Sequence, residues 1–158
     1  MTVMRSFIAG DLFEITDEDV FNNEMFCKMY AKLKKINSLN AEVVNGFLTQ
    51  FVIARHFDFR APELFNLHDD GVDYKIGDVK IDIKSTLFKK NNPRLFVTYS
   101  SKLKADYYLL FQNIGKKYIK FVGCASADKI KEINRVQQLK YKKCYIINFE
   151  ELNKNLVL

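Results

Sequence analysis

Residues 70–85 read Asp-Gly-Val-Asp-Tyr-Lys-Ile-Gly-Asp-Val-Lys-Ile-Asp-Ile-Lys-Ser, and this stretch determines the kind of fold that the chain can adopt. Apolar and polar residues alternate on either side of Gly77-Asp78, as they do in two half-buried strands joined by a two-residue turn. The sequence therefore predicts a tight β-hairpin in which Ile76 faces Val79. Counting back from the turn, Asp73 then faces Asp82 on the other strand.

The predicted pairing of Asp73 with Asp82 points to metal chemistry. Directly opposed residues on one face of a sheet have Cβ atoms about 4.5–5.5 Å apart, so two carboxylates there repel each other. A divalent cation between them removes the repulsion, because such cations bind carboxylate oxygens. Lys84 projects from the same face and can orient a water or stabilise charge on a phosphate. The alternative is an exposed hairpin in which Lys84 offsets part of the repulsion through an ion pair.

Upstream of the hairpin, the spacing of apolar residues predicts two helices. The first begins at Thr16, where Asp19 completes a capping-box-like pair, and runs to about Ile36. Its apolar residues at helical spacing are Val20, Phe21, Met25, Met29 and Leu33. The second helix starts near Ser38 or Asn40 and runs to about His56, and its broad apolar face predicts that it is buried.

Downstream of the hairpin, period-two patterns and turn residues predict further strands and one more helix. The strands are expected at residues 95–99, 107–112, 118–124 and 144–149, and the helix at residues 126–136. Two helices, a mostly antiparallel sheet and a crossing helix together predict an α/β fold. The 158 residues contain no internal repeat or linker, so one domain spanning residues 1–158 is expected.

Charge is distributed unevenly along the chain. Residues 1–82 carry 9 Lys or Arg and 14 Asp or Glu, whereas residues 83–127 carry 9 Lys or Arg and a single acid, Asp106. Such polarity within one small domain indicates a face for a polyanion such as DNA. A generic lysine-rich, solubilising surface is the alternative explanation.

Several classes of protein are disfavoured by the composition. No apolar run approaches the roughly 18 residues that span a bilayer, and the N-terminus lacks a signal-peptide core. The three cysteines, Cys27, Cys124 and Cys144, lie far apart, which argues against a disulfide framework or a zinc site. We therefore expect a cytoplasmic, intracellular protein with no membrane partner; a phage, viral or mobile-element origin is one setting for it.

The residues Asp73 and Asp82-Ile83-Lys84, on consecutive predicted strands, resemble the motif of the PD-(D/E)xK nuclease superfamily. This resemblance covers roughly residues 38–136 and implies a restriction-endonuclease-like core: a mixed, mostly antiparallel sheet flanked by helices. The catalytic core would span residues 38–149, and residues 1–37 would form an N-terminal helical extension. Because the Gln-x-x-x-Tyr signature of the RecB-like branch is not evident, a small free-standing endonuclease is favoured.

The resemblance also implies roles for individual residues. Asp73 and Asp82 would bind Mg²⁺, for which Mn²⁺ would substitute, together with the main-chain carbonyl of Ile83. Lys84 would position the attacking water, and these folds place an acidic residue on a helix before the first core strand. Glu42 is the natural candidate for that third acid, with Glu63 and Asp70 as the rivals.

The implied activity is metal-dependent hydrolysis of DNA by an endonuclease of the homing, restriction-like or junction-resolving kind. The alternative is a non-catalytic nucleic-acid-binding module with a nuclease-like fold. Cutting two strands requires two sites, so a homodimer or higher homo-oligomer is expected, with the N-terminal helix as one possible interface and ordinary core as its other role. The basic and polar residues expected to contact DNA are Lys75, Lys80, Ser85, Lys89, Lys90, Arg94, Lys102 and Lys104.

Overall fold

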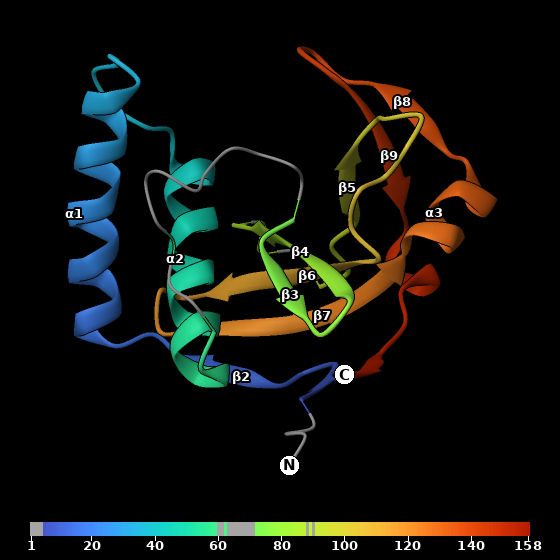
Figure 1. Ribbon diagram of the computed structural model, residues 1–158, viewed down its shortest axis with the longest axis horizontal. Helices are drawn as coiled ribbons and strands as arrows, with labels where there is room; N and C mark the ends of the chain where they lie inside the picture. The colour runs from blue at the N-terminus through green and yellow to red at the C-terminus, as the bar shows by residue number, and fades with distance from the viewer. Residues whose placement is uncertain (1–4, 60–61, 63–71, 88, 90) are drawn as a thin grey trace.

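The computed structural model describes residues 5–59, 62, 72–87, 89 and 91–158, and these residues form an α/β fold (Figure 1). Helices α1 (Asp17–Leu33) and α2 (Ala41–Phe57) lie side by side at one end of the molecule, and α3 (Ala127–Ile133) lies at the other end. The strands are β1 (Ser6–Ile8), β2 (Leu12–Glu14), β3 (Tyr74–Ile76), β4 (Val79–Thr86), β5 (Leu95–Thr98), β6 (Tyr107–Ile114), β7 (Tyr118–Ser126), β8 (Val136–Gln138), β9 (Lys143–Ile147) and β10 (Asn155–Val157), with a short 3-10 helix, η2 (Phe149–Glu151), before the last.

The main sheet has five strands in the order β2-β7-β6-β4-β3. Strands β4 and β6 are parallel, and the other neighbouring pairs are antiparallel. The described residues also form a three-stranded sheet, β5-β9-β8, and the pair β1-β10. The predicted α/β class and the predicted mixed sheet are therefore confirmed.

The hairpin that joins β3 to β4 has the predicted register. Ile76 pairs with Val79, and Lys75 pairs with Lys80. Gly77 opens the turn with φ of +60°, a conformation that side chains with a Cβ rarely adopt. The turn length and the glycine therefore set which residues oppose each other along both strands.

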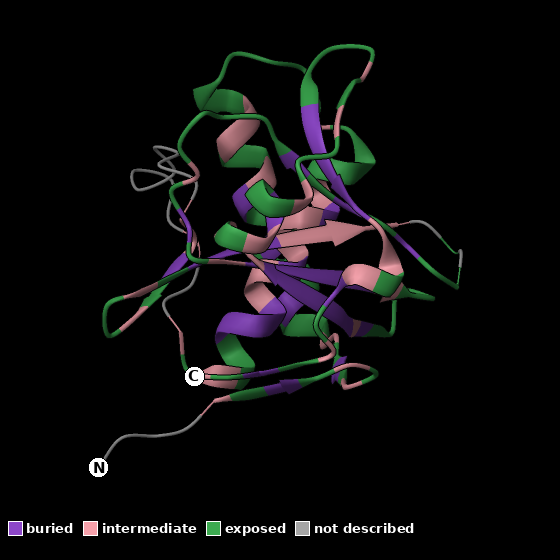
Figure 2. Ribbon diagram, turned by 90° about the vertical axis from the view of Figure 1, so that its right-hand side faces the viewer, coloured by how far each residue is buried: buried purple, intermediate pink, exposed green. Residues whose placement is uncertain are grey.

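Two apolar cores lie on opposite faces of the main sheet. Figure 2 shows that buried residues are concentrated along the central strands. On one face, Ile81 and Ile83 of β4 pack in a cluster with Val52 and Ile53 of α2. On the other face, residues such as Leu110 pack against the three-stranded sheet. The β4 side chains that do not face α2 lie on the side of the second core, where they are partly enclosed.

The N-terminal segment differs from the expected helical extension. Strand β2 forms an edge of the main sheet through its pairing with β7, and β1 pairs with β10. Phe7 and Phe13 are buried in the core beside α2. Three-residue strands are too short to establish a recognisable period, which is why the sequence pattern did not reveal them.

The predicted helices form, but some of them end at other residues than predicted. Helix α1 has the predicted capping box at Thr16 but ends at Leu33, close to Lys35 with φ of +57°. Helix α3 ends at Ile133, before Asn134 with φ of +48°, and residues 136–138 form β8 instead of continuing the helix. No helix in the described part of the chain is long and apolar enough to cross a bilayer.

The apolar stripe that identified α1 in the sequence does not face the core. Phe21, Met25, Met29 and Leu33 are exposed, whereas the buried residues of the helix are Asp19, Asn23 and Phe26. Phe26 packs against Phe47 and Phe51 of α2, so an aromatic contact and two polar residues form the inner face.

Candidate active site

Strand β4 carries two of the charged residues of the candidate site. Ile81 and Ile83 point toward α2, so Asp82 and Lys84 project from the opposite face of the sheet. There Lys84 Nζ lies 2.7 Å from Asp82 Oδ2. The Asp82 side chain is 7% exposed and that of Lys84 is 36% exposed. Lys84 therefore connects a buried carboxylate to the solvent.

Asp73 lies beside Asp82 because the pairing of the hairpin changes at this residue. The Asp73 N–H donates to the Ile81 carbonyl at 2.9 Å, although Tyr74 is the residue in register with Ile81. Two residues opposite one is the arrangement of a β-bulge, which redirects side chains. The Asp73 carboxylate accepts a 2.7 Å hydrogen bond from the Ile83 N–H, and the Asp82 carboxyl group lies close enough to raise the pKa of Asp73. The two carboxyl groups therefore lie near each other through this bulge, and not through the direct Asp73–Asp82 pairing that the register predicted.

The electrostatics of this pair of carboxyl groups are unfavourable for two negative charges. Burial raises the pKa of Asp73 well above its ordinary value, and the charge and hydrogen bond of Asp82 raise it further. The Ile83 N–H and the Lys84 ammonium lower it, but they do not outweigh the first two causes. Without a cation, the pair therefore either shares a proton or retains like-charge repulsion.

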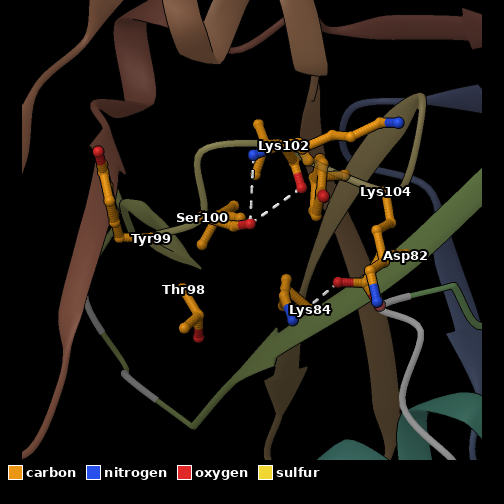
Figure 3. A pocket seen from close by; sticks show the side chains of 10 residues that line it. Asp82, Lys84, Thr98, Tyr99, Ser100, Lys102 and Lys104 are labelled. Carbon is orange, nitrogen blue, oxygen red and sulfur yellow. Dashed lines mark hydrogen bonds and ion pairs between the residues drawn. The ribbon is translucent and has the colours of Figure 1, made fainter.

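A cavity of about 270 Å³ opens beside Asp82 and Lys84 (Figure 3). Its walls are formed by β4, β6, the end of β5 and the segment that follows β5. Lys102 and Lys104, which were predicted to contact phosphates, line this cavity together with Asp82 and Lys84. The structure therefore brings three lysines to the same cavity as the buried carboxylate.

Three further lining residues, Tyr99, Ser100 and Tyr108, were not identified from the sequence. Ser100 Oγ accepts from the Lys102 N–H at 3.3 Å and donates to the Lys102 carbonyl at 2.9 Å, which holds the loop in place. Burial raises the pKa of Tyr108, so its hydroxyl stays protonated within reach of the charges of Asp82 and Lys84. The polar run directly after β5 was the available signal for this wall.

The other basic residues predicted to contact DNA that the structure describes do not line this cavity. Lys75 and Lys80 are an exposed pair on the hairpin, and Lys89 is exposed as well. The Arg94 guanidinium lies over the Phe96 ring, 5.2 Å from its centre. Lys90 lies outside the described residues.

Ser85 lies on the opposite face of the sheet from the cavity. A Cβ atom added to Gly46 of α2 would lie 3.8 Å from Ser85 Oγ, so this hydroxyl faces the helix. Gly46 of α2 and Ser85 of β4 are therefore neighbours across the packed face. The predicted phosphate contact of Ser85 is not brought to the cavity by this arrangement.

Glu42 is exposed in the first turn of α2, the helix that covers the Ile81 and Ile83 face. Within the described part of the chain, no group of three Asp, Glu, His or Cys side chains comes together as a possible metal site. In this structure Glu42 is therefore not grouped with Asp73 and Asp82. The rivals Glu63 and Asp70 lie outside the described residues.

Asp73→Asn is expected to stabilise the cation-free protein at neutral pH. An asparagine amide can accept from the Ile83 N–H and donate to the Asp82 carboxylate, which removes a like-charge contact worth about 1 kcal/mol. The expected rise in melting temperature, measured by calorimetry in EDTA, is about 3 °C.

The pH dependence of this gain follows from the raised pKa of Asp73. The stabilisation that comes from protonating Asp73 is complete below its ordinary pKa of 3.8 and is lost as the pH rises through the higher pKa of the folded state. Asparagine does not titrate, so the advantage of the variant should grow from acidic to neutral pH. An equal difference at all pH values would contradict this origin.

The arrangement has a clear chemical capacity. Two adjoining carboxyl groups can hold a divalent cation, and the nearby ammonium can bind a water or a phosphate oxygen. Comparison of the chain with known protein families, curated proteins and solved structures finds no match. The functional interpretation therefore depends on the geometry of the site.

Proposed function

We propose that this chain is a Mg²⁺-dependent DNA endonuclease whose active site contains Asp73, Asp82 and Lys84. The observation that carries the proposal is the proximity of the Asp73 and Asp82 carboxyl groups. Asp82 lines a cavity together with three lysines, and Lys84 Nζ lies 2.7 Å from Asp82 Oδ2. A stable fold gains nothing from buried like charges unless a cation or proton accompanies them. In a purely structural hairpin the Lys84–Asp82 ion pair would offset part of this repulsion, but it does not outweigh the burial and the like charge that raise the pKa of Asp73.

The donor set suits a hard divalent cation. Asp73 and Asp82 would hold Mg²⁺, or Mn²⁺ in its place, with the Ile83 carbonyl as a further ligand. The cation would neutralise charge on the scissile phosphate and acidify a bound water. Lys84 would orient that water or stabilise phosphate charge from its position between Asp82 and the solvent.

A restriction-endonuclease-like core is part of the same proposal. The β3–β4 hairpin carries Asp82, with Asp73 just before it, and its second strand, β4, is parallel to β6. Strands β6 and β7 form a long antiparallel pair. Helix α2 covers the face opposite the cavity. This order of elements is consistent with the PD-(D/E)xK resemblance of the motif.

The surface beyond the cavity suits a nucleic acid. Tyr99 at the cavity wall has Lys143 Nζ 4.3 Å from its ring centre. The turn between β8 and β9 continues this basic and aromatic character with Tyr141, which is 86% exposed and approached by Lys140. Lysines bind phosphates, and exposed tyrosine rings stack on unpaired bases.

The non-catalytic alternative is favoured by one observation. Among the described residues no third carboxylate joins Asp73 and Asp82, and a site with two acids would bind a cation less tightly than a complete one. A protein of this kind would bind DNA through the lysine-lined surface without cutting it.

The two functions are distinguished by incubating the purified chain with supercoiled plasmid in Mg²⁺, in Mn²⁺ and in EDTA. The endonuclease proposal predicts nicked or linear product in either cation and none in EDTA. DNA binding without cutting in any of these buffers would support the non-catalytic module. If the chain neither binds nor cuts DNA, both proposed functions are overturned.

A further inference from the structure

Helix α1 exposes a continuous apolar stripe to the solvent. Phe21, Met25, Met29 and Leu33 recur every four residues and are between 45% and 61% exposed. Residues at this spacing lie on one face of a helix. Isolated exposed apolar residues are ordinary, but a row of large ones along a helix marks an interaction surface.

The fold does not allow this stripe to turn inward. The opposite face of α1 is held against α2 by the Phe26–Phe47 contact, with ring centres 4.9 Å apart, and by the Asp19–Arg55 ion pair at 3.0 Å. Figure 1 shows α1 at the outer edge of the molecule, with α2 on its inner side. The stripe therefore faces away from the only helix beside it among the described residues.

The charges that accompany the stripe differ between the two halves of the helix. Exposed acids, Asp17, Glu18 and Glu24, lie in the first half, whereas exposed lysines follow in the second half and just beyond it. These lysines are Lys28, Lys32, Lys34 and Lys35. A helix with complementary charge that covers the stripe must therefore place basic residues beside the first half of α1 and acidic residues beside the second half.

We propose that the α1 stripe is the interface of an antiparallel homodimer. A second copy of α1 running in the opposite direction has the required charge order, with its lysines beside the acids and its acids beside the lysines. A two-fold axis near the middle of the helix would put Phe21 against the partner's Leu33 and Met25 against the partner's Met29. Methionine and aromatic side chains are favoured in such contacts.

Antiparallel pairing is preferred over a parallel pair on electrostatic grounds. A parallel arrangement would place acidic halves together and lysine-rich halves together, and like charges across an interface oppose association. Antiparallel helices also place opposite ends of their macrodipoles beside each other. The inference stands without the nuclease proposal, although a dimer would supply that enzyme with two sites.

The test measures the oligomeric state of the full chain by sedimentation velocity over a range of concentrations. The wild type is expected to form a dimer that dissociates on dilution, and Met25→Glu is expected to be monomeric. Val157→Glu is the matched control, because Val157 is 55% exposed on β10 and should leave the dimer intact. A wild type that stays monomeric up to about 100 µM, or a Met25→Glu variant that still dimerises, would overturn the proposal.

A charge exchange tests the antiparallel geometry. Glu24→Lys and Lys28→Glu should each weaken dimerisation by about tenfold, and the double variant should recover most of the wild-type affinity. Circular dichroism should report an unchanged fold, since both residues are exposed. If the double variant is weaker than either single variant, the antiparallel dimer is wrong. Because no DNA is present, a negative result here is distinguishable from failure of the cleavage assay.

Discussion

Replacing Lys84 by alanine is expected to lower the rate of Mg²⁺-dependent DNA cleavage by about 1,000-fold. Its ammonium lies 2.7 Å from Asp82 Oδ2, and its side chain lines the cavity. Among the ion pairs described, this one places a positive charge beside a proposed metal ligand. Loss of the ammonium removes a group that acts on the reacting water or phosphate, while the apolar side of β4 is untouched. The measurement is the single-turnover rate of plasmid nicking.

Two variants separate this effect from a general loss of positive charge. Lys117→Ala removes an exposed lysine from the β6–β7 turn, outside the cavity, and should change the nicking rate only a few-fold. Asp82→Asn should abolish nicking as well, because it removes a proposed metal ligand. If Lys84→Ala nicks plasmid as fast as the wild type, Lys84 has no catalytic role.

Replacing Asp19 by alanine is expected to cost about 3 kcal/mol of stability. The Asp19 carboxylate accepts from the Thr16 N–H at 2.9 Å, which caps α1, and it is buried against Arg55, whose Nη2 lies 3.0 Å away. Alanine removes both interactions and leaves the Arg55 charge without this partner. Since the Arg55 side chain is 37% exposed, solvent compensates part of the loss, and the estimate stays at the lower end for a buried ion pair.

The measurement is thermal unfolding, with an expected drop in melting temperature of roughly 9 °C. Asp17→Ala is the matched control, because Asp17 is an exposed acid in the same helical turn and should matter by well under 1 kcal/mol. Asp19→Asn keeps an oxygen for the Thr16 N–H but lacks the charge, so it should fall between the two. Equal effects of Asp17→Ala and Asp19→Ala would contradict this account.

The contribution of Asp19 should also depend on pH. Burial acts to raise the pKa of Asp19, but the hydrogen bonds from Arg55 and Thr16 outweigh it, so the pKa is below its ordinary value of 3.8. The stabilisation is therefore present above pH 3.8 and is lost as the pH falls through the lower pKa of the folded state. In that acidic range, the difference in stability between wild type and Asp19→Asn should shrink.

The central hairpin shows how far local pattern reaches. Alternation and a two-residue turn were enough to predict that Ile76 pairs with Val79 and Lys75 with Lys80, because strand register is a local property once the turn is known. The bulge-like step at Asp73, which lets its carboxylate bind the Ile83 N–H, was not visible in the pattern. It arises from how the two strands pair, not from the residue types alone.

The first helix shows where local pattern fails. Its apolar spacing correctly predicted a helix, and Thr16 with Asp19 correctly predicted its cap. The spacing did not decide whether the stripe forms core or an interface. In the structure Phe21 is 61% exposed and Asp19 is on the inner face. A polar residue can be buried when a distant partner such as Arg55 satisfies it, and sequence spacing does not identify that partner.

The sequence by itself determined the hairpin, the helix cap, the adjacent acidic residues and the unequal distribution of charge, because each depends on residues close together in the chain. Only the tertiary structure decided that the segment after β5 closes a cavity over Asp82 and Lys84, that Ser85 faces α2, and that Glu42 stays apart from the acidic pair. These outcomes depend on which face of each element is covered, and packing between distant segments, not local periodicity, sets that choice.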